Sequence, residues 1–156
     1  MTAWRLVKKK HAAAALSGEG ARLGGGRWNH VGISVVYASE TLSLAVLELF
    51  VHFTRRDITI SRSLLAVPIE IPDSVTKIEV LPANLKKGWD SSPPPDFTKD
   101  LGTRWVHEGK SAILRVPSAV IQNEFNLVIN LNHPDLGKIV AGDARPFSLD
   151  DRVWKK

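Results

Sequence analysis

Three side chains within residues 24–48 have the types and spacing that a small-ligand pocket requires. They are the cation of Arg27, the ring and hydroxyl of Tyr37, and the carboxylate of Glu48. Arg27 lies in a glycine-rich basic stretch, Tyr37 in a short apolar strand and Glu48 in a strongly apolar helix. A sharp turn between the strand and the helix would bring the three together. The residue types alone do not name a reaction.

Each of these residues also has a purely structural explanation. Backbone amides and Arg27 suit a phosphate, but the loop lacks the ending of a Walker A motif and the spacing of a dinucleotide fingerprint, so a structural turn is favoured. Tyr37 on an apolar strand is more often a core residue whose hydroxyl finds a partner. Glu48 is costly to bury unless it is paired or solvated in a cleft, and an exposed polar edge shared with His52 explains it equally well.

The elements that must position these residues follow from the hydrophobic pattern. Residues 33–37 alternate as a strand whose inward face carries Tyr37. Ser39 is predicted to cap a helix over residues 41–53, and this helix is apolar on nearly all sides, which is typical of a buried helix. Residues 19–32 are expected to form a long irregular loop, whose glycines allow positive φ and a close approach of backbone to a ligand.

The rest of the chain adds more strands and two helices. A first strand over residues 3–7 would place Arg5 on the face opposite Trp4. Helices are expected at residues 11–16 and 97–107. Further strands are predicted at residues 64–71, 75–80, 112–116, 125–131 and 138–140, with a short last segment at 147–154. A few helices among many separated strands predict the α+β class with a mostly antiparallel sheet, rather than a doubly wound parallel one.

Length and composition indicate one soluble domain over residues 1–156. The chain has 44% hydrophobic and 24% charged residues, which argues against a disordered or fibrous class. Its longest apolar run is shorter than the about 20 residues that cross a bilayer, and the apolar patch at residues 12–16 is too short for a signal peptide. The chain has no cysteine, so disulfides and thiolate metal sites are excluded, and the cytoplasm is the expected location.

A formal charge of +5 and a pI near 9.7 favour contact with something anionic: nucleic acid, a phosphate-bearing ligand or an acidic protein. The basic runs at residues 8–10 and 55–56 are short and typical of solvated surface. No signature of a nucleic-acid reader accompanies the charge. The histidines lack the pairing with carboxylates that is typical of a metal site, so no metal is predicted.

Several short motifs occur in an order and spacing that are more specific than any one of them. They are W-R-L at residues 4–6, G-G-R-W-N at 25–29, G-I-S-V-V-Y-A-S at 32–39, A-V-L-E at 45–48, V-P-S at 116–118 and F-N-L-V-I-N-L-N-H-P at 125–134. Together they resemble the RES domain family, the toxins of RES-Xre type II toxin–antitoxin systems. One departure is that Leu131 and Asn132 follow Asn130, where the family usually has Asn-Pro before the His-Pro pair.

The resemblance implies an ADP-ribosyltransferase-like fold and a toxin that depletes cellular NAD by cleaving the nicotinamide–ribose bond, through hydrolysis or phosphorolysis. NAD would be the substrate, and no cofactor is implied. Arg27, Tyr37 and Glu48 match the family's arginine, tyrosine and glutamate, and these three are the expected catalytic residues. The residues expected to bind NAD are Arg5, Arg27, Tyr37, Ser118 and Asn126.

Two other functions stay open at this point. One is a mono-ADP-ribosyltransferase that modifies a protein target, and the other is a basic binding module without catalysis. The resemblance also implies a cognate Xre-type antitoxin that covers the pocket. The toxin would then contact nucleic acid only through the antitoxin. A homodimer of the toxin within a larger hetero-oligomer is compatible with the resemblance.

Overall fold

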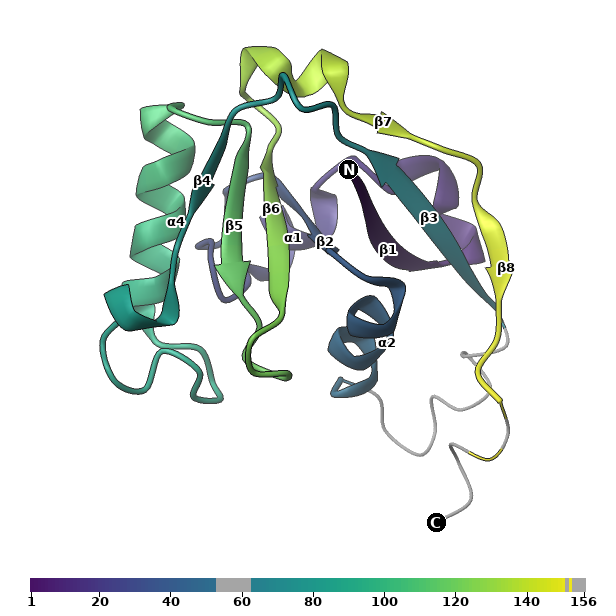
Figure 1. Ribbon diagram of the computed structural model, residues 1–156, viewed down its shortest axis with the longest axis horizontal. Helices are drawn as coiled ribbons and strands as arrows, with labels where there is room; N and C mark the ends of the chain where they lie inside the picture. The colour runs from purple at the N-terminus through teal and green to yellow at the C-terminus, as the bar shows by residue number, and fades with distance from the viewer. Residues whose placement is uncertain (53–62, 151, 153–156) are drawn as a thin grey trace.

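The strands of the protein form one sheet. The structure is a computed structural model that describes residues 1–52, 63–150 and 152. The strands are β1 Thr2–Lys8, β2 Val35–Ser39, β3 Leu64–Glu70, β4 Lys77–Glu79, β5 Ile113–Pro117, β6 Phe125–Asn130, β7 Val140–Ala141 and β8 Arg145–Phe147. Their order is β4-β5-β6-β2-β1-β3-β7, and β8 pairs with the start of β3 (Figure 1). Among the described strands, only β4 and β5 pair in parallel. The predicted α+β class with a mostly antiparallel sheet is confirmed.

Helical segments connect the strands. Within the described residues these are the helices α1 Glu19–Gly24, α2 Leu42–Phe50 and α4 Asp96–Glu108, and the 3-10 turns η1 Lys9–Ala14, η3 Pro82–Asn84 and η4 Pro134–Lys138. The longest, α4, is capped at its C-terminus by Gly109, whose φ of 59° is the left-handed conformation common at this position. No helix in the described part of the chain has the length and apolar character needed to cross a membrane.

Both faces of the central strands are buried, as the two-residue period of a strand allows. On one face, Val35 and Val128 pack with Trp105 of α4 and with Trp28. Tyr37 packs partly buried against the same cluster, so the prediction that it faces the core is confirmed. The core on the other face includes Val36, Ala38, Ile113, Leu127 and Ile129.

The helix that carries Glu48 is less buried than its sequence predicts. Leu44 and Ala45 are buried, but Leu47 is 38% exposed and Val51, just after the helix, is 56% exposed. The expectation of a helix buried on all sides is therefore wrong, because the sheet covers only one side of α2. The predicted helix cap lies two residues too early: Thr41, not Ser39, is the N-cap, and its side chain accepts from the Leu44 N–H.

Other boundaries differ from the expectations as well. Residues 19–32 are not wholly irregular, because α1 forms after Gly18, whose φ is 68°. The strand predicted at residues 75–80 is reduced to β4, which is exposed at the edge of the sheet. The alanine-rich helix is a 3-10 turn that begins at Lys9. The predicted helix end at residue 53, the basic pair at 55–56 and most of the segment after residue 150 lie outside the described residues.

Candidate active site

Two hydrogen bonds to the same carboxylate oxygen hold Glu48. The Ser118 hydroxyl donates to Oε1 at 2.7 Å, and Nδ2 of Asn126 donates to Oε1 at 2.5 Å. Among the described residues, none donates a hydrogen bond to Oε2. Of the two explanations open for Glu48, the structure favours a paired carboxylate over an exposed polar edge.

Strand pairing explains why these three residues meet from distant parts of the chain. β6 lies between β2 and β5, and Asn126 of β6 is opposite Ser39 of β2. Ser118 directly follows β5, and its N–H donates to the Glu124 carbonyl at 2.9 Å where the chain turns toward β6. α2 begins shortly after β2 ends, and so carries Glu48 to this same end of the two strands.

Tyr37 ties β2 to the loop that carries Arg27. Its hydroxyl donates to Oδ1 of Asn29 at 2.7 Å and accepts from the Trp28 N–H at 3.0 Å. Burial raises the pKa of the Tyr37 hydroxyl well above its usual 10.0, so the hydroxyl stays a donor. Asn29 is itself completely buried, and its Nδ2 donates to the backbone carbonyls of Ala21, His30 and Ile33.

Two glycines allow this loop to lie so close to its neighbours. A Cβ on Gly26 would lie 2.6 Å from the Tyr37 hydroxyl. A Cβ on Gly102 of α4 would collide with the carbonyl oxygen of Trp28. The loop is thus clamped between β2 and α4, which agrees with the structural explanation of its glycine-rich sequence.

Arg27 is half-buried, and its guanidinium binds two backbone carbonyls. Its Nη1 donates to the carbonyls of Trp89 at 2.6 Å and Ser91 at 3.0 Å. Burial lowers the pKa of the guanidinium, and the carboxylates of Glu48 and Asp90 oppose that change. Arg27 and Glu48 therefore lie within electrostatic range of each other. Within the described residues, Nε and Nη2 of Arg27 have no hydrogen-bond acceptor.

Arg5 lies where β1 and β2 separate. The two strands pair at one position, Trp4 opposite Ser39, and beyond it Nη1 of Arg5 donates to the Tyr37 carbonyl at 2.6 Å. Nε of Arg5 is buried, and no group in the described part of the chain accepts from it. Burial also lowers the pKa of this guanidinium. A buried cation with an unpaired donor is costly, and an anion bound beside it would reduce that cost.

The six predicted residues form two groups that β2 joins. Arg5, Arg27 and Tyr37 form one group, and Glu48, Ser118 and Asn126 form the other. Sequence reasoning missed two further members. The sequence predicts that Ser39 caps a helix, but Ser39 lies two residues from Tyr37, and so on the same strand face, and its hydroxyl donates to Asn126. Asn29 lies in the predicted loop, and no local sequence pattern indicates that it is buried.

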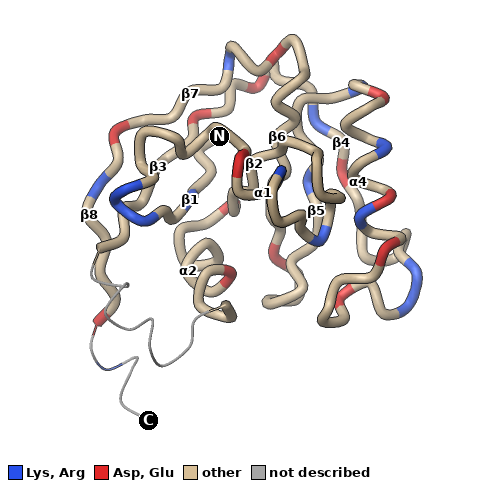
Figure 2. The backbone as a smooth tube through the Cα atoms, turned by 180° about the vertical axis from the view of Figure 1, so that it is seen from behind, with Lys and Arg blue, Asp and Glu red and all other residues tan. Residues whose placement is uncertain are grey.

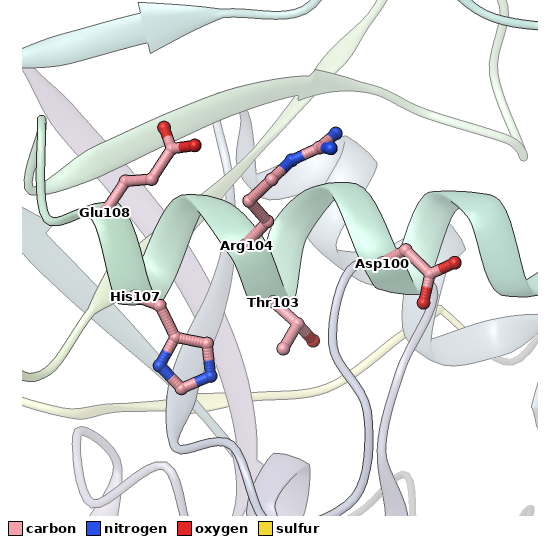
Figure 3. Close-up of a pocket in the computed structure, with 5 residues that line it drawn as sticks. All are labelled: Asp100, Thr103, Arg104, His107 and Glu108. Atoms are coloured by element: carbon pink, nitrogen blue, oxygen red, sulfur yellow. The ribbon is translucent and has the colours of Figure 1, made fainter.

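Two surface hollows lie away from Glu48, and their side chains do not converge as those of the candidate site do. One is lined by Asp100, Thr103, Arg104, His107 and Glu108 of α4. Figure 3 shows Arg104 and Glu108 on one side of the helix and Thr103 and His107 on the other, so they do not meet at a point. Another is lined by Ser63 and the lysines at residues 8–10, in the basic run where β1 ends (Figure 2). Among the described residues, no group of three or more His, Cys, Asp or Glu is placed to hold a metal ion.

Comparison with known proteins identifies relatives of this chain. The RES domain family matches residues 2–150. The chain is 40% identical to a Prs ADP-ribosylating toxin of Sphingobium sp. (strain YBL2), over 98% of this chain and 96% of that protein. It is 34% identical to a Toxin Res of Photorhabdus laumondii subsp. laumondii, over 99% of this chain and 98% of that protein.

The fold is also similar to a solved structure. A chain of the M. tuberculosis MbcT-MbcA toxin–antitoxin complex superimposes with a TM-score of 0.72 at 16% identity, covering 94% of this chain and 84% of that one. This likeness shows a shared fold, and the sequence matches show the family. The chain therefore belongs to the RES domain family and is a relative of the toxins named Res.

Proposed function

We propose that this chain is the toxin of a toxin–antitoxin system and that it degrades NAD by cleaving the nicotinamide–ribose bond, through hydrolysis or phosphorolysis. Glu48 carries the proposal, because its Oε1 is held by two donors and its Oε2 is left for a ligand. The name of the Sphingobium relative adds support, since ADP-ribosylation from NAD breaks the same bond.

Glu48 would act on the ribose. As nicotinamide leaves with the electrons of the glycosidic bond, positive charge builds on the ribose ring, as in other glycosyl transfers. Oε2, accepting from a ribose hydroxyl, would stabilise that charge as it develops. Water or phosphate then bonds to the same ribose carbon and loses a proton. The held Oε1 keeps the carboxylate in place throughout.

Arg27 and Arg5 would bind the pyrophosphate of NAD. An arginine presents five N–H donors, and Nη1 of Arg27 uses only part of that set on the Trp89 and Ser91 carbonyls. Charge-assisted hydrogen bonds to a phosphate would come from the remaining donors. For Arg5, the buried Nε without a described acceptor supports the same role.

Tyr37 would stack its ring on nicotinamide and hold it in a leaving orientation. The two hydrogen bonds of its hydroxyl support this role because they fix where the ring lies. Ser118 and Asn126 are proposed to contact the ribose or the nicotinamide amide. Both donate a hydrogen bond to Glu48, which gives them a second task of holding that carboxylate.

A second candidate function is mono-ADP-ribosylation of a protein target. The observation in its favour is the name of the Sphingobium relative, Prs ADP-ribosylating toxin. The same pocket would serve, with a protein side chain in place of water or phosphate as the acceptor. A third possibility, a basic binding module, would leave NAD intact and would bind its partner less tightly as salt increases.

The partner of the toxin would be an Xre-type antitoxin that covers the pocket in the cytoplasm. The relation to a chain from a toxin–antitoxin complex supports such an assembly. Nucleic acid would be contacted only through the antitoxin, and the toxin would form a homodimer within the hetero-oligomer. Coexpression with the neighbouring gene followed by size-exclusion chromatography tests the assembly, and separate migration of the two proteins would contradict it.

Incubation of the purified protein with NAD labelled in its adenylate half separates the enzymatic functions. Free labelled ADP-ribose indicates hydrolysis, and labelled ADP-ribose phosphate formed only with added phosphate indicates phosphorolysis. Label that stays on protein after denaturation indicates transfer. Intact NAD in every sample, including one with cell extract as the source of target proteins, would rule out all three.

A further inference from the structure

Ser39 completes a chain of side-chain hydrogen bonds that ends at Glu48. The Ser39 hydroxyl donates to Oδ1 of Asn126 at 2.7 Å, and Nδ2 of Asn126 donates to Oε1 of Glu48. Ser39 is 4% exposed, so it has almost no access to solvent. This serine is therefore one hydrogen-bonded residue away from the carboxylate without touching it.

The direction of this chain follows from chemistry. An ionised carboxylate only accepts hydrogen bonds, so Asn126 must turn its NH₂ group toward Glu48. Its carbonyl oxygen then faces the opposite way, where only a donor suits it, and the Ser39 hydroxyl is that donor. Without the hydroxyl, Oδ1 loses its partner and the amide is free to turn over. The turned amide would set Oδ1 against the carboxylate, which is repulsive.

The backbone of Ser39 is well placed for this task. Ser39 is the last residue of β2 and pairs with Asn126 of β6 on one side and with Trp4 of β1 on the other. The next residue, Glu40, donates its N–H to the Phe125 carbonyl and accepts two hydrogen bonds from Arg115. The Ser39 hydroxyl is thus held between two paired strands, close to the end of both.

We propose that Ser39 is a positioning residue, which orients the Asn126 amide and through it Glu48 for cleavage of NAD; this rests on the function proposed above. Ser39→Ala then lowers kcat for NAD cleavage about tenfold, the scale of one neutral hydrogen bond. KM is expected to change less than kcat, because Ser39 reaches NAD only through Asn126 and the two arginines proposed to bind the pyrophosphate are unchanged.

Ser111→Ala is the matched control. Ser111 is also buried, at 1% exposure, and its hydroxyl accepts from Nε1 of Trp105 at 2.8 Å and donates to the Ile113 carbonyl at 2.9 Å. Its loss leaves two buried groups without partners far from Glu48, so it lowers Tm without changing kcat. If Ser111→Ala lowers both Tm and kcat as much as Ser39→Ala does, the role of Ser39 is only structural.

A double-mutant cycle with Asn126→Ala tests the route. If Ser39 acts through Asn126, Ser39→Ala causes no further loss of kcat once Asn126 is alanine. A full tenfold loss in both backgrounds would overturn the proposal. So would a kcat of Ser39→Ala equal to that of the wild type.

A separate readout distinguishes failure of this inference from failure of the proposed function. In ¹⁵N–¹H spectra of the ligand-free protein, Ser39→Ala is expected to move the side-chain NH₂ resonances of Asn126, and Ser111→Ala is not. If the wild-type protein leaves NAD intact, the proposed function fails, and these resonances still decide the arrangement. Unchanged Asn126 resonances in Ser39→Ala would contradict the positioning role in either case.

Discussion

The Tyr37 hydroxyl and the Asn29 side chain are joined by a 2.7 Å hydrogen bond that fixes the loop carrying Arg27 to the central sheet. Both partners are strongly constrained: Asn29 is fully buried, and Tyr37 also accepts from the Trp28 N–H. The position of the guanidinium that is proposed to bind NAD therefore depends on a tyrosine ten residues later in the sequence. The first prediction concerns this link.

Tyr37→Phe removes one hydroxyl and leaves Oδ1 of Asn29 and the Trp28 N–H without that partner. We expect the free energy of unfolding to fall by about 1–3 kcal/mol, the cost of unsatisfied buried groups. Urea denaturation measures the change. Equal midpoints for the variant and the wild type, with equal slopes, would show that the hydroxyl does not hold the loop.

Tyr37 is also the only tyrosine in the chain, so its ionisation can be followed by phenolate absorbance. Burial raises its pKa above the usual 10.0, and the folded protein should show no phenolate signal near that pH. In the unfolded state the hydroxyl ionises near pH 10, so the unfolded state binds fewer protons above that pH and stability falls as pH rises further. A folded protein that titrates at pH 10 would contradict this burial.

Gly26→Ala tests the close approach of the loop to Tyr37. The added Cβ would lie 2.6 Å from the hydroxyl and 2.9 Å from Oδ1 of Asn29, so we expect a loss of about 1–3 kcal/mol from overpacking. Gly24→Ala is the control, because a Cβ there meets nothing within 4 Å. Chemical denaturation of both variants gives the comparison. The prediction fails if the two alanines have the same effect.

Arg27→Lys tests whether the several N–H donors of the guanidinium are needed at this position. A lysine ammonium keeps the charge but cannot hold the Trp89 and Ser91 carbonyls and bind a pyrophosphate with a second arm. We expect KM for NAD to rise at least about tenfold. Arg22→Lys, in the nearby α1, changes only an exposed ion pair with Glu19 and should keep the wild-type KM. Equal KM values for all three proteins would remove Arg27 from binding.

The parts of the site that rest on local pattern could be predicted. The two-residue period of β2 places Tyr37 toward the core, and a carboxylate at position 48 is conspicuous within an apolar helix. The period also puts Ser39 on the face of Tyr37, but a serine before a helix suggests a cap, and Thr41 has that role. The family resemblance supplied Arg5, Ser118 and Asn126, which local pattern does not single out.

The contacts among these residues depend on long-range pairing. Glu48 meets Ser118 and Asn126 because β6 lies between β2 and β5, and no short motif specifies that order. The bond from Arg5 to the Tyr37 carbonyl exists because β1 and β2 pair at only one position. The partial exposure of α2 is unpredictable for a related reason, since its apolar composition does not say how much of the helix the sheet covers.

The central claim is that Glu48 drives cleavage of NAD, and release of nicotinamide by purified protein tests it most directly. The wild type should release nicotinamide, and Glu48→Gln should be slower by at least about 100-fold in kcat with an unchanged circular dichroism spectrum. Glu108→Gln changes a surface ion pair between the last residue of α4 and Lys110, and should match the wild type. A wild-type protein that leaves NAD intact, or a Glu48→Gln variant that cleaves it at the wild-type rate, would contradict the account.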